Sequence, residues 1–117
     1  MAALDMRVPV TNQFVAMSAV VWINERQAMV ATMSHDRRIA TCEITRGSMP
    51  EPSYLAQAVR VIGDRQRVMI LGPSSIRLAL EREYVTHYQR PDRLVDVEWA
   101  PVPHLQDLVE RLRTLAD

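Results

Sequence analysis

The stretch from residue 66 to residue 84 constrains the fold most, because an apolar run changes there into a segment with helical spacing. Residues 67–71 (RVMIL) have the length and composition of a buried strand, and apolar residues then recur at Ile76, Leu80 and Tyr84. Between them, residues 72–75 (GPSS) combine a glycine that tolerates unusual backbone angles, a proline that fixes φ, and serines that can cap a helix. The stretch predicts a strand, a turn and a helix of an α/β sandwich, at the edge where the strand ends.

Three strands are predicted upstream of this unit. Residues 15–23 are almost wholly apolar and rich in β-branched side chains, which favours a central strand buried on both faces. Residues 27–33 are extended after a polar turn, and residues 38–44 alternate after a second one, as in a strand with one wetter face. We expect this third strand at the edge of the sheet, where its charged residues would discourage pairing with other chains.

Periodicity and turn residues divide the rest of the chain. Prolines and a glycine indicate a loop after the third strand, and three segments have the spacing of amphipathic helices. The predicted elements are a loop at 46–52, a helix at about 53–62 with Ser53 as its N-cap, a strand at 66–71, a helix at about 75–88, a strand at 94–97 and a helix over 105–115.

The order β-β-β-α-β-α-β-α predicts an α/β fold. Three antiparallel strands followed by right-handed βαβ units give a five-stranded mixed sheet of order 3-2-1-4-5, with helices on both faces. That arrangement is a ribonuclease H-like three-layer sandwich. We expect a flexible arm at 1–13 and a single domain over 14–117.

Charge and cysteine content limit the partners and the compartment. The 14 basic residues balance the 14 acidic ones, so any contact with nucleic acid must be a local patch. All the basic residues are arginine, which suits bidentate contacts to phosphate and is equally what a GC-rich coding bias produces. One cysteine, Cys42, cannot form an internal disulfide, and no membrane span or secretory signal is present. These features predict a cytoplasmic protein.

Catalytic and metal sites are not predicted. A two-metal nuclease on this fold needs several carboxylates on the central strands, and neither 15–23 nor 66–71 contains one. His35, His87 and His104 lie in separate elements without a cysteine or carboxylate at metal-ligand spacing. We therefore expect no enzyme activity and no cofactor, with a metal-dependent nuclease only as a remote alternative.

The turn after the fourth predicted strand is a candidate anion site. Backbone N–H groups of Gly72, Ser74 and Ser75 and the positive end of the following helix can hold a phosphate, with Arg77 one turn along. The alternative is a plain connection whose serine caps the helix, and it is favoured because the motif is not a Walker loop.

Two other surfaces are candidates for binding. Arg37 and Arg38 at a hairpin tip, with Arg46 in the following loop, can form a small basic cluster for RNA phosphates, although a solvated rim is the favoured alternative. Trp99 after the last strand and Met49 in the 46–52 loop are expected to be exposed, as a partner surface.

Three blocks of sequence carry a family resemblance. VVWINERQA at 20–28, VMILGP at 68–73 and LVDVE at 94–98 resemble small bacterial proteins called translational machinery proteins. Those proteins resemble the middle domain of the archaeal and eukaryotic type of peptide-chain release factor. The resemblance spans about residues 15–115 and implies a ribonuclease H-like fold and association with the ribosome.

The loop at 46–52 departs from that family. Release factors of this type carry Gly-Gly-Gln between the third strand and the first helix, whereas RGSMPEP here has one glycine and no glutamine, so peptide release is not expected. The histidine-rich stretch that small bacterial relatives often have in this loop is also missing. The first hypothesis is a non-catalytic ribosome- or RNA-associated accessory domain. The alternative is a protein-interaction module, as a homodimer through an edge strand or the Trp99 surface.

Overall fold

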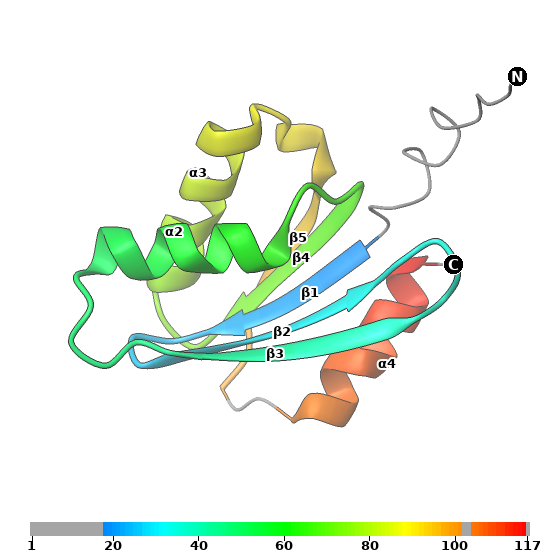
Figure 1. Cartoon of the computed structure of the whole chain (residues 1–117), viewed down its shortest axis with the longest axis horizontal. Helices are drawn as coiled ribbons and strands as arrows, with labels where there is room; N and C mark the ends of the chain where they lie inside the picture. Colours follow the sequence, from blue (N-terminus) through cyan, green and yellow to red (C-terminus); the bar gives the residue numbers. More distant parts are fainter. Residues whose placement is uncertain (1–17, 102–103, 117) are drawn as a thin grey trace, which may run out of the picture.

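One mixed sheet organises the chain, in the spatial order β3-β2-β1-β4-β5 (Figure 1). The computed structural model describes residues 18–101 and 104–116, so the predicted arm at 1–13 and the predicted strand start at 15–17 lie outside the described residues. The strands are β1 (Ser18–Ile23), β2 (Gln27–Met33), β3 (Ile39–Thr45), β4 (Arg67–Gly72) and β5 (Leu94–Trp99). The helices are α2 (Glu51–Ile62), α3 (Ile76–Tyr88), a 3-10 turn (Pro91–Arg93) and α4 (Leu105–Ala116).

The pairing of the strands confirms the predicted topology. β1 pairs antiparallel with β2, and β2 pairs antiparallel with β3. On the other side β1 pairs parallel with β4, and β4 pairs parallel with β5. The sheet therefore joins a hairpin meander to two βα units, which is the arrangement that short turns and right-handed crossovers dictate.

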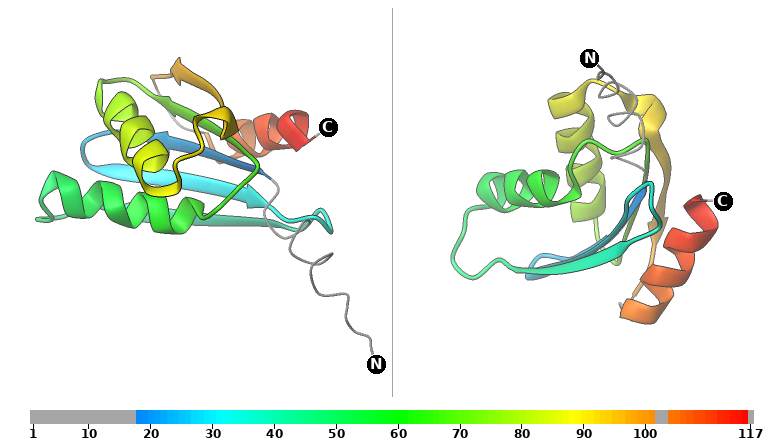
Figure 2. Two further views of the ribbon diagram at one scale, coloured as in Figure 1. Left: turned by 90° about the horizontal axis from the view of Figure 1, so that it is seen from above. Right: turned by 45° about the vertical axis from the view of Figure 1, so that its right-hand side comes forward.

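The helices cover both faces of the sheet. α2 and α3 lie on one face and α4 lies on the other, which gives three layers (Figure 2). The β1 side chains alternate between them: Ala19, Val21 and Ile23 pack under α2 and α3. Val20 and Trp22 pack under α4. The continuous apolar run of β1 is thus explained by burial on both faces.

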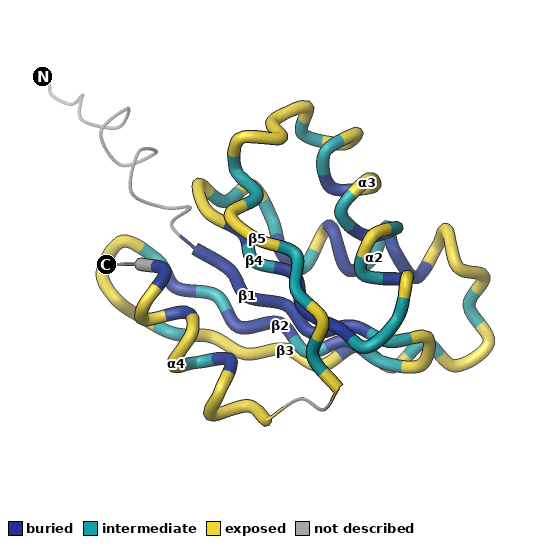
Figure 3. The backbone as a smooth tube through the Cα atoms, turned by 180° about the vertical axis from the view of Figure 1, so that it is seen from behind, coloured by how far each residue is buried: buried dark blue, intermediate teal, exposed yellow. Residues whose placement is uncertain are grey.

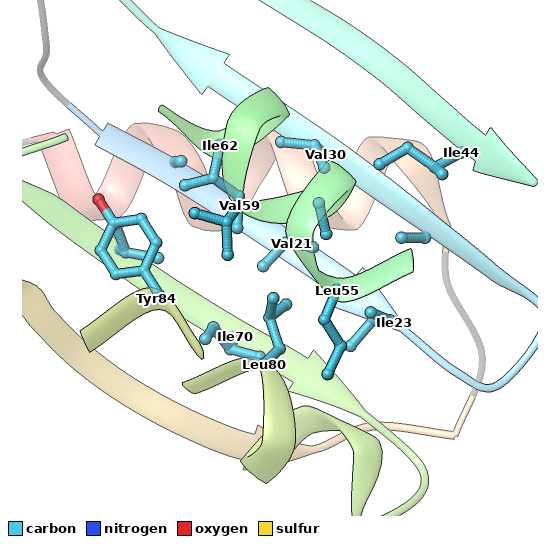
Figure 4. Packing of buried hydrophobic residues seen from close by; sticks show 14 of the residues in the cluster. Val21, Ile23, Val30, Ile44, Leu55, Val59, Ile62, Ile70, Leu80 and Tyr84 are labelled. Carbon is cyan, nitrogen blue, oxygen red and sulfur yellow. The ribbon is translucent and has the colours of Figure 1, made fainter. Parts of the chain in front are cut away.

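Each face has its own core. Under α2 and α3, Val21 and Ile70 from the central strands meet Leu55 and Val59 of α2 and Leu80 of α3 (Figure 4). Under α4, the core is smaller and contains the buried leucines of that helix, Leu108, Leu112 and Leu115. The outer face of α4 is exposed, as its amphipathic sequence predicts (Figure 3).

The start of α2 differs from the prediction. The helix begins at Glu51, its N-cap is Pro50 with extended backbone angles, and no side chain caps it, so the prediction of Ser53 as the cap was wrong. Pro52 lies in the first turn instead of ending the loop. A proline there loses nothing, because the first N–H groups of a helix have no intrahelical acceptor.

A long-range hydrogen bond ties the last connection to the centre of the sheet. The indole Nε1–H of buried Trp22 donates to the carbonyl of Ala100 at 3.0 Å. The chain leaving β5 is therefore held against β1 before it turns into α4. Among the described residues, no helix has the length and apolarity to cross a bilayer.

A candidate nucleic-acid interface at the carboxyl edge of the sheet

Three connections meet at the end of the sheet where β1 and β4 finish, at the left of Figure 1. They are the β1–β2 turn at 24–26, the β3–α2 loop at 46–50 and the β4–α3 turn at 73–75. Glu25 joins all three. Its backbone carbonyl accepts a bond from Arg46 Nη1 at 3.2 Å, and its carboxylate oxygen Oε2 accepts one from Ser74 Oγ at 2.6 Å.

Arg46 holds the base of the β3–α2 loop. Its Nε donates to the carbonyl of Met49 at 2.8 Å, and its guanidinium carbon lies 5.6 Å from the centroid of the Tyr54 ring. The N–H of Met49 donates back to the carbonyl of Arg46 at 3.1 Å and closes a tight turn. The guanidinium of Arg46 is therefore part of the scaffold, because its Nε bonds to the loop and its Nη1 bonds to Glu25.

The 24–26 turn is held from beneath by Tyr54 and from within by Asn24. The buried phenol of Tyr54 donates to the carbonyl of Asn24 at 2.9 Å. The side-chain oxygen of Asn24 accepts the N–H groups of Arg26 at 2.8 Å and Gln27 at 2.9 Å, as in an Asx turn. A well-satisfied turn of this kind presents its remaining side chains in fixed positions.

Burial changes the acidity of this phenol. Desolvation raises the pKa of Tyr54 to about 12, although the positive charge of Arg46 opposes the shift. Because the folded pKa exceeds the unfolded one, the stability that the neutral phenol contributes is complete below the unfolded pKa of about 10. It is lost as the pH rises from there through the folded pKa.

We predict that Tyr54→Phe lowers the free energy of unfolding at neutral pH by about 1 kcal/mol, because the carbonyl of Asn24 loses its donor. The variant should also lose less stability than the wild type above pH 10. Urea unfolding at both pH values measures the two effects. Tyr88→Phe, at a partly buried ring packed against His87 and Tyr84, is the control and should leave the free energy of unfolding at neutral pH unchanged. Equal alkaline losses in wild type and Tyr54→Phe would contradict the prediction.

Polar groups remain free at the outer surface of this edge. The side chain of Arg26 is exposed, and no described residue pairs with its guanidinium. Gly47 has φ +59 and open space where a side chain would be, and Ser48 is exposed beside it. Together these groups surround a hollow of about 520 Å³. The hollow is lined by Glu25, Arg26, Thr45, Arg46, Gly47, Ser48 and Met49.

The predicted anion turn is occupied by the protein's own groups. Ser74 Oγ bonds to the carboxylate of Glu25, and Arg77 Nη1 donates to the carbonyl of Ser74 at 2.7 Å. Ser75 is exposed at the start of α3 and makes no side-chain cap. An anion at this turn would have to displace or face the negative charge of Glu25.

Gly72 has a different role from the predicted one. It does not have a positive φ, so it is not required for an unusual backbone angle. It is the buried last residue of β4, and a Cβ placed there would lie 2.3 Å from the carbonyl oxygen of Ile23. Glycine is required because two backbones approach closely.

The arginines predicted to cluster lie at opposite ends of β3. Arg37 and Arg38 are in the β2–β3 turn, where Arg37 has φ +68 and Arg38 pairs with Asp36 at 3.1 Å. Arg46 follows the last residue of the strand, roughly 25 Å away at about 3.3 Å per residue. One chain therefore does not bring these arginines together.

The two predicted apolar contacts have different exposures. Trp99 is 64% exposed, as expected. Met49 is partly buried and packs against the core under α2 and α3, so the expectation of an exposed Met49 was wrong. The turn at 46–49 directs that side chain inward because Arg46 holds its backbone.

Sequence reasoning missed Arg26, Glu25 and Tyr54 in this site. The signal for the turn was Asn24, since asparagine at the end of a strand commonly forms an Asx turn. No local pattern shows that Tyr54 or Ser74 reaches that turn from 30 and 49 residues away. Among residues 18–101 and 104–116, no three His, Cys, Asp or Glu side chains gather closely enough to share a metal ion.

The topology defines an α/β domain with a five-stranded mixed sheet, and solved structures of translation termination factors share its fold. The chain is similar to an archaeal translation termination factor, aRF1, with a TM-score of 0.59 at 13% sequence identity, over 80% of this chain and 32% of that one. It is similar to Dom34 of S. cerevisiae, a translation termination-like factor involved in RNA quality control pathways and interacting with Hbs1. There the TM-score is 0.55 at 11% identity, over 82% of this chain and 32% of that one.

A third similar structure is Pelota of Archaeoglobus fulgidus, with a TM-score of 0.55 at 14% identity, over 92% of this chain and 34% of that one. The chain thus spans about a third of the length of each of these proteins. No protein-family model matches the sequence, and no curated protein sequence does either. At these identities the likeness is one of fold.

Proposed function

We propose that this chain is a non-catalytic, cytoplasmic accessory domain that associates with the ribosome or its RNA, and that it is a relative of the bacterial translational machinery proteins. The observation that carries the proposal is the likeness of 80–92% of the chain to parts of aRF1, Dom34 and Pelota. Two of these are described as a translation termination factor and a termination-like factor. Three blocks of sequence that resemble the translational machinery proteins support the same assignment.

The carboxyl edge of the sheet supplies the contact surface in this proposal. Arg26 offers an exposed guanidinium without a described partner, which suits a bidentate bond to a phosphate. The neighbouring loop adds the exposed hydroxyl of Ser48 and the open backbone at Gly47. Because Arg46 fixes this loop and Tyr54 fixes the 24–26 turn from beneath, the surface is preorganised for binding.

The same loop supports a role without peptide release. Residues 46–52 contain one glycine and no glutamine, so the Gly-Gly-Gln segment of release factors has no counterpart. The side chain of Arg46 holds the backbone of the loop and that of Glu25. We therefore assign the loop to contact and not to chemistry.

Association with ribosomes is expected to depend on Arg26. The wild-type chain should sediment with ribosomes at low salt and be released at raised salt, because the contact replaces counterions on phosphates. Arg26→Glu should weaken the association by roughly tenfold, since it turns an attraction to phosphate into a repulsion. Arg113→Glu, which reverses an exposed charge on α4, is the matched control and should bind like the wild type.

Sedimentation at several salt concentrations measures these affinities. The slope of log affinity against log salt should be smaller for Arg26→Glu than for Arg113→Glu. Equal losses of ribosome affinity in the two variants would mean that association depends on net charge alone and not on Arg26. Absence of the wild type from the ribosomal pellet at low salt would overturn the proposal.

A further inference from the structure

The edge strand β3 is open along its outer side. It is the last strand of the sheet, and no described segment pairs with its free edge (Figure 3). Glu43 is the single charged residue within Ile39–Thr45. Arg38 lies in the preceding turn, where it pairs with Asp36. The strand has no proline and no bulge against β2. One of the two charges expected to discourage pairing, Arg38, thus lies outside the strand.

The ladder with β2 determines which residues of β3 have N–H and C=O groups that point away from the sheet, along its free edge. The N–H of Ser34 donates to the carbonyl of Arg38, and the N–H of Arg46 donates to the carbonyl of Arg26, at the two ends of that ladder. Bonded and non-bonded pairs alternate along an antiparallel ladder, so even-numbered residues of β3 bond to β2. The residues with outward N–H and C=O groups are Ile39, Thr41, Glu43 and Thr45.

We propose that β3 pairs antiparallel with β3 of a second copy, about a two-fold axis at Cys42, to form a symmetric dimer with one continuous sheet. This inference goes beyond the proposed function and needs no RNA. In this register Thr41 lies opposite Glu43 of the second copy, and Ile39 lies opposite Thr45. All four are outward-bonding residues, so the pairs exchange about eight hydrogen bonds in total.

The position of Glu43 and the paired length of the strands favour this register over its neighbour. A shift by two residues that places Glu43 opposite Glu43 of the second copy sets like charges face to face, which is unfavourable. The register centred on Cys42 keeps the whole length of both strands paired and gives each Glu43 a threonine neighbour. The exposed thiols of the two Cys42 residues then face each other in a non-bonded pair, with Cα atoms about 4.5 Å apart.

The helices leave room for the second copy. α2 and α4 pack over β1 and β2 and leave most side chains of β3 exposed on both faces. In the pair, the two α4 helices would stand about four strand spacings apart, roughly 19 Å, which exceeds the width of a helix. The other edge strand is less suitable, because β5 is irregular next to Met69 and carries Asp96 and Glu98.

Pairing would also join the separated arginines. Arg38 of one copy lies opposite Arg46 of the other, so the β2–β3 turn comes beside the loop that starts at Arg46. Like charges gather there, and salt screens their repulsion. Raised salt should therefore favour the dimer while it weakens any contact with RNA, which separates this inference from the proposed function.

Sedimentation velocity of the full chain under reducing conditions tests the pairing. The wild type should show a concentration-dependent dimer, weak because an edge-only interface is small. Thr41→Pro removes an outward N–H and leaves the ladder with β2 intact, so the association constant should fall by roughly tenfold or more. Thr41→Ala keeps that N–H and should dimerise like the wild type. A wild type that stays monomeric into the millimolar range overturns the inference, as does an unchanged dimer in Thr41→Pro.

A charge pair tests the register without a proline. Thr41→Lys places a cation opposite Glu43 of the second copy and should strengthen the dimer, whereas Thr41→Glu should weaken it. A nitroxide on Cys42, the single cysteine, should show dipolar broadening in the dimer. Equal effects of lysine and glutamate, or a dimer without broadening, would place the contact elsewhere and overturn the inference.

Discussion

Gly72→Ala is expected to lower the free energy of unfolding by about 2–4 kcal/mol, although it adds one methyl group. The added carbon would lie 2.3 Å from the carbonyl oxygen of Ile23, at the parallel contact of β4 with β1. The oxygen is a backbone atom and the Cβ would be attached directly to the backbone, both in the centre of the sheet, so relief requires the strands to separate. Urea unfolding monitored by circular dichroism measures the loss.

Gly47→Ala is the matched control for this prediction. Gly47 has φ +59 and open space around its Cβ position, so alanine there has only backbone strain, about 1 kcal/mol. Gly72→Ala should therefore lose clearly more unfolding free energy, through its close contact, than Gly47→Ala loses through its strained backbone angle. If the two variants lose the same stability, the close approach of β4 to Ile23 is not rigid.

Leu112→Ala is expected to lower the free energy of unfolding by about 3 kcal/mol. Leu112 is fully buried in the core under α4, together with Val20 and Trp22 of β1. Truncation leaves a cavity against a central strand that already packs on both faces, so the sheet cannot collapse to fill it. We therefore expect the packing of α4 to be required for the stability of the whole sheet.

The control for Leu112 lies on the same helix. Leu105 is 43% exposed at the start of α4, and Leu105→Ala should lose less than about 1 kcal/mol. Thermal or urea unfolding of both variants should remain a single transition, since α4 and one face of the sheet form the core under α4 together. Separate melting of the helix, with the sheet unaffected by Leu112→Ala, would contradict this account.

Most of the fold was predictable from local patterns. The apolar run of β1 indicated a central strand buried on both faces. All six residues of β1 are buried, and the strand lies between β2 and β4. The amphipathic spacing of residues 105–115 indicated one buried stripe, and Leu108, Leu112 and Leu115 are buried, whereas Leu105 at the start of α4 is 43% exposed. The handedness of βαβ connections then left one natural order of strands, which is the order observed.

The errors arose where backbone position overrides residue preference. Ser53 looked like a cap, but the helix starts at Glu51, because a proline at Pro52 fits the first turn as well as it fits a loop. Gly72 looked like a turn glycine, yet the contact that requires it lies with Ile23, in another strand. The residues next to these positions in the sequence do not show where α2 begins or that Gly72 lies against Ile23.

The candidate site was the least predictable part. Its polar contacts join residues far apart in sequence, such as Ser74 with Glu25 and Arg46 with the carbonyl of Glu25. The sequence showed several arginines near turns but not which ones are used internally. Arg46 is held by its own loop, whereas Arg26, which no motif indicated, is exposed without a described partner.

The most direct test of the central claim is photo-crosslinking from the edge that is proposed to contact RNA. A photoreactive amino acid in place of Ser48 should crosslink the chain to ribosomal RNA when ribosomes are present at low salt. The same group in place of Arg113, on the exposed face of α4, should give little product. Crosslinks from position 48 that depend on intact Arg26 are the predicted result. Equal yields from the two positions, or no RNA product from position 48, would contradict the account.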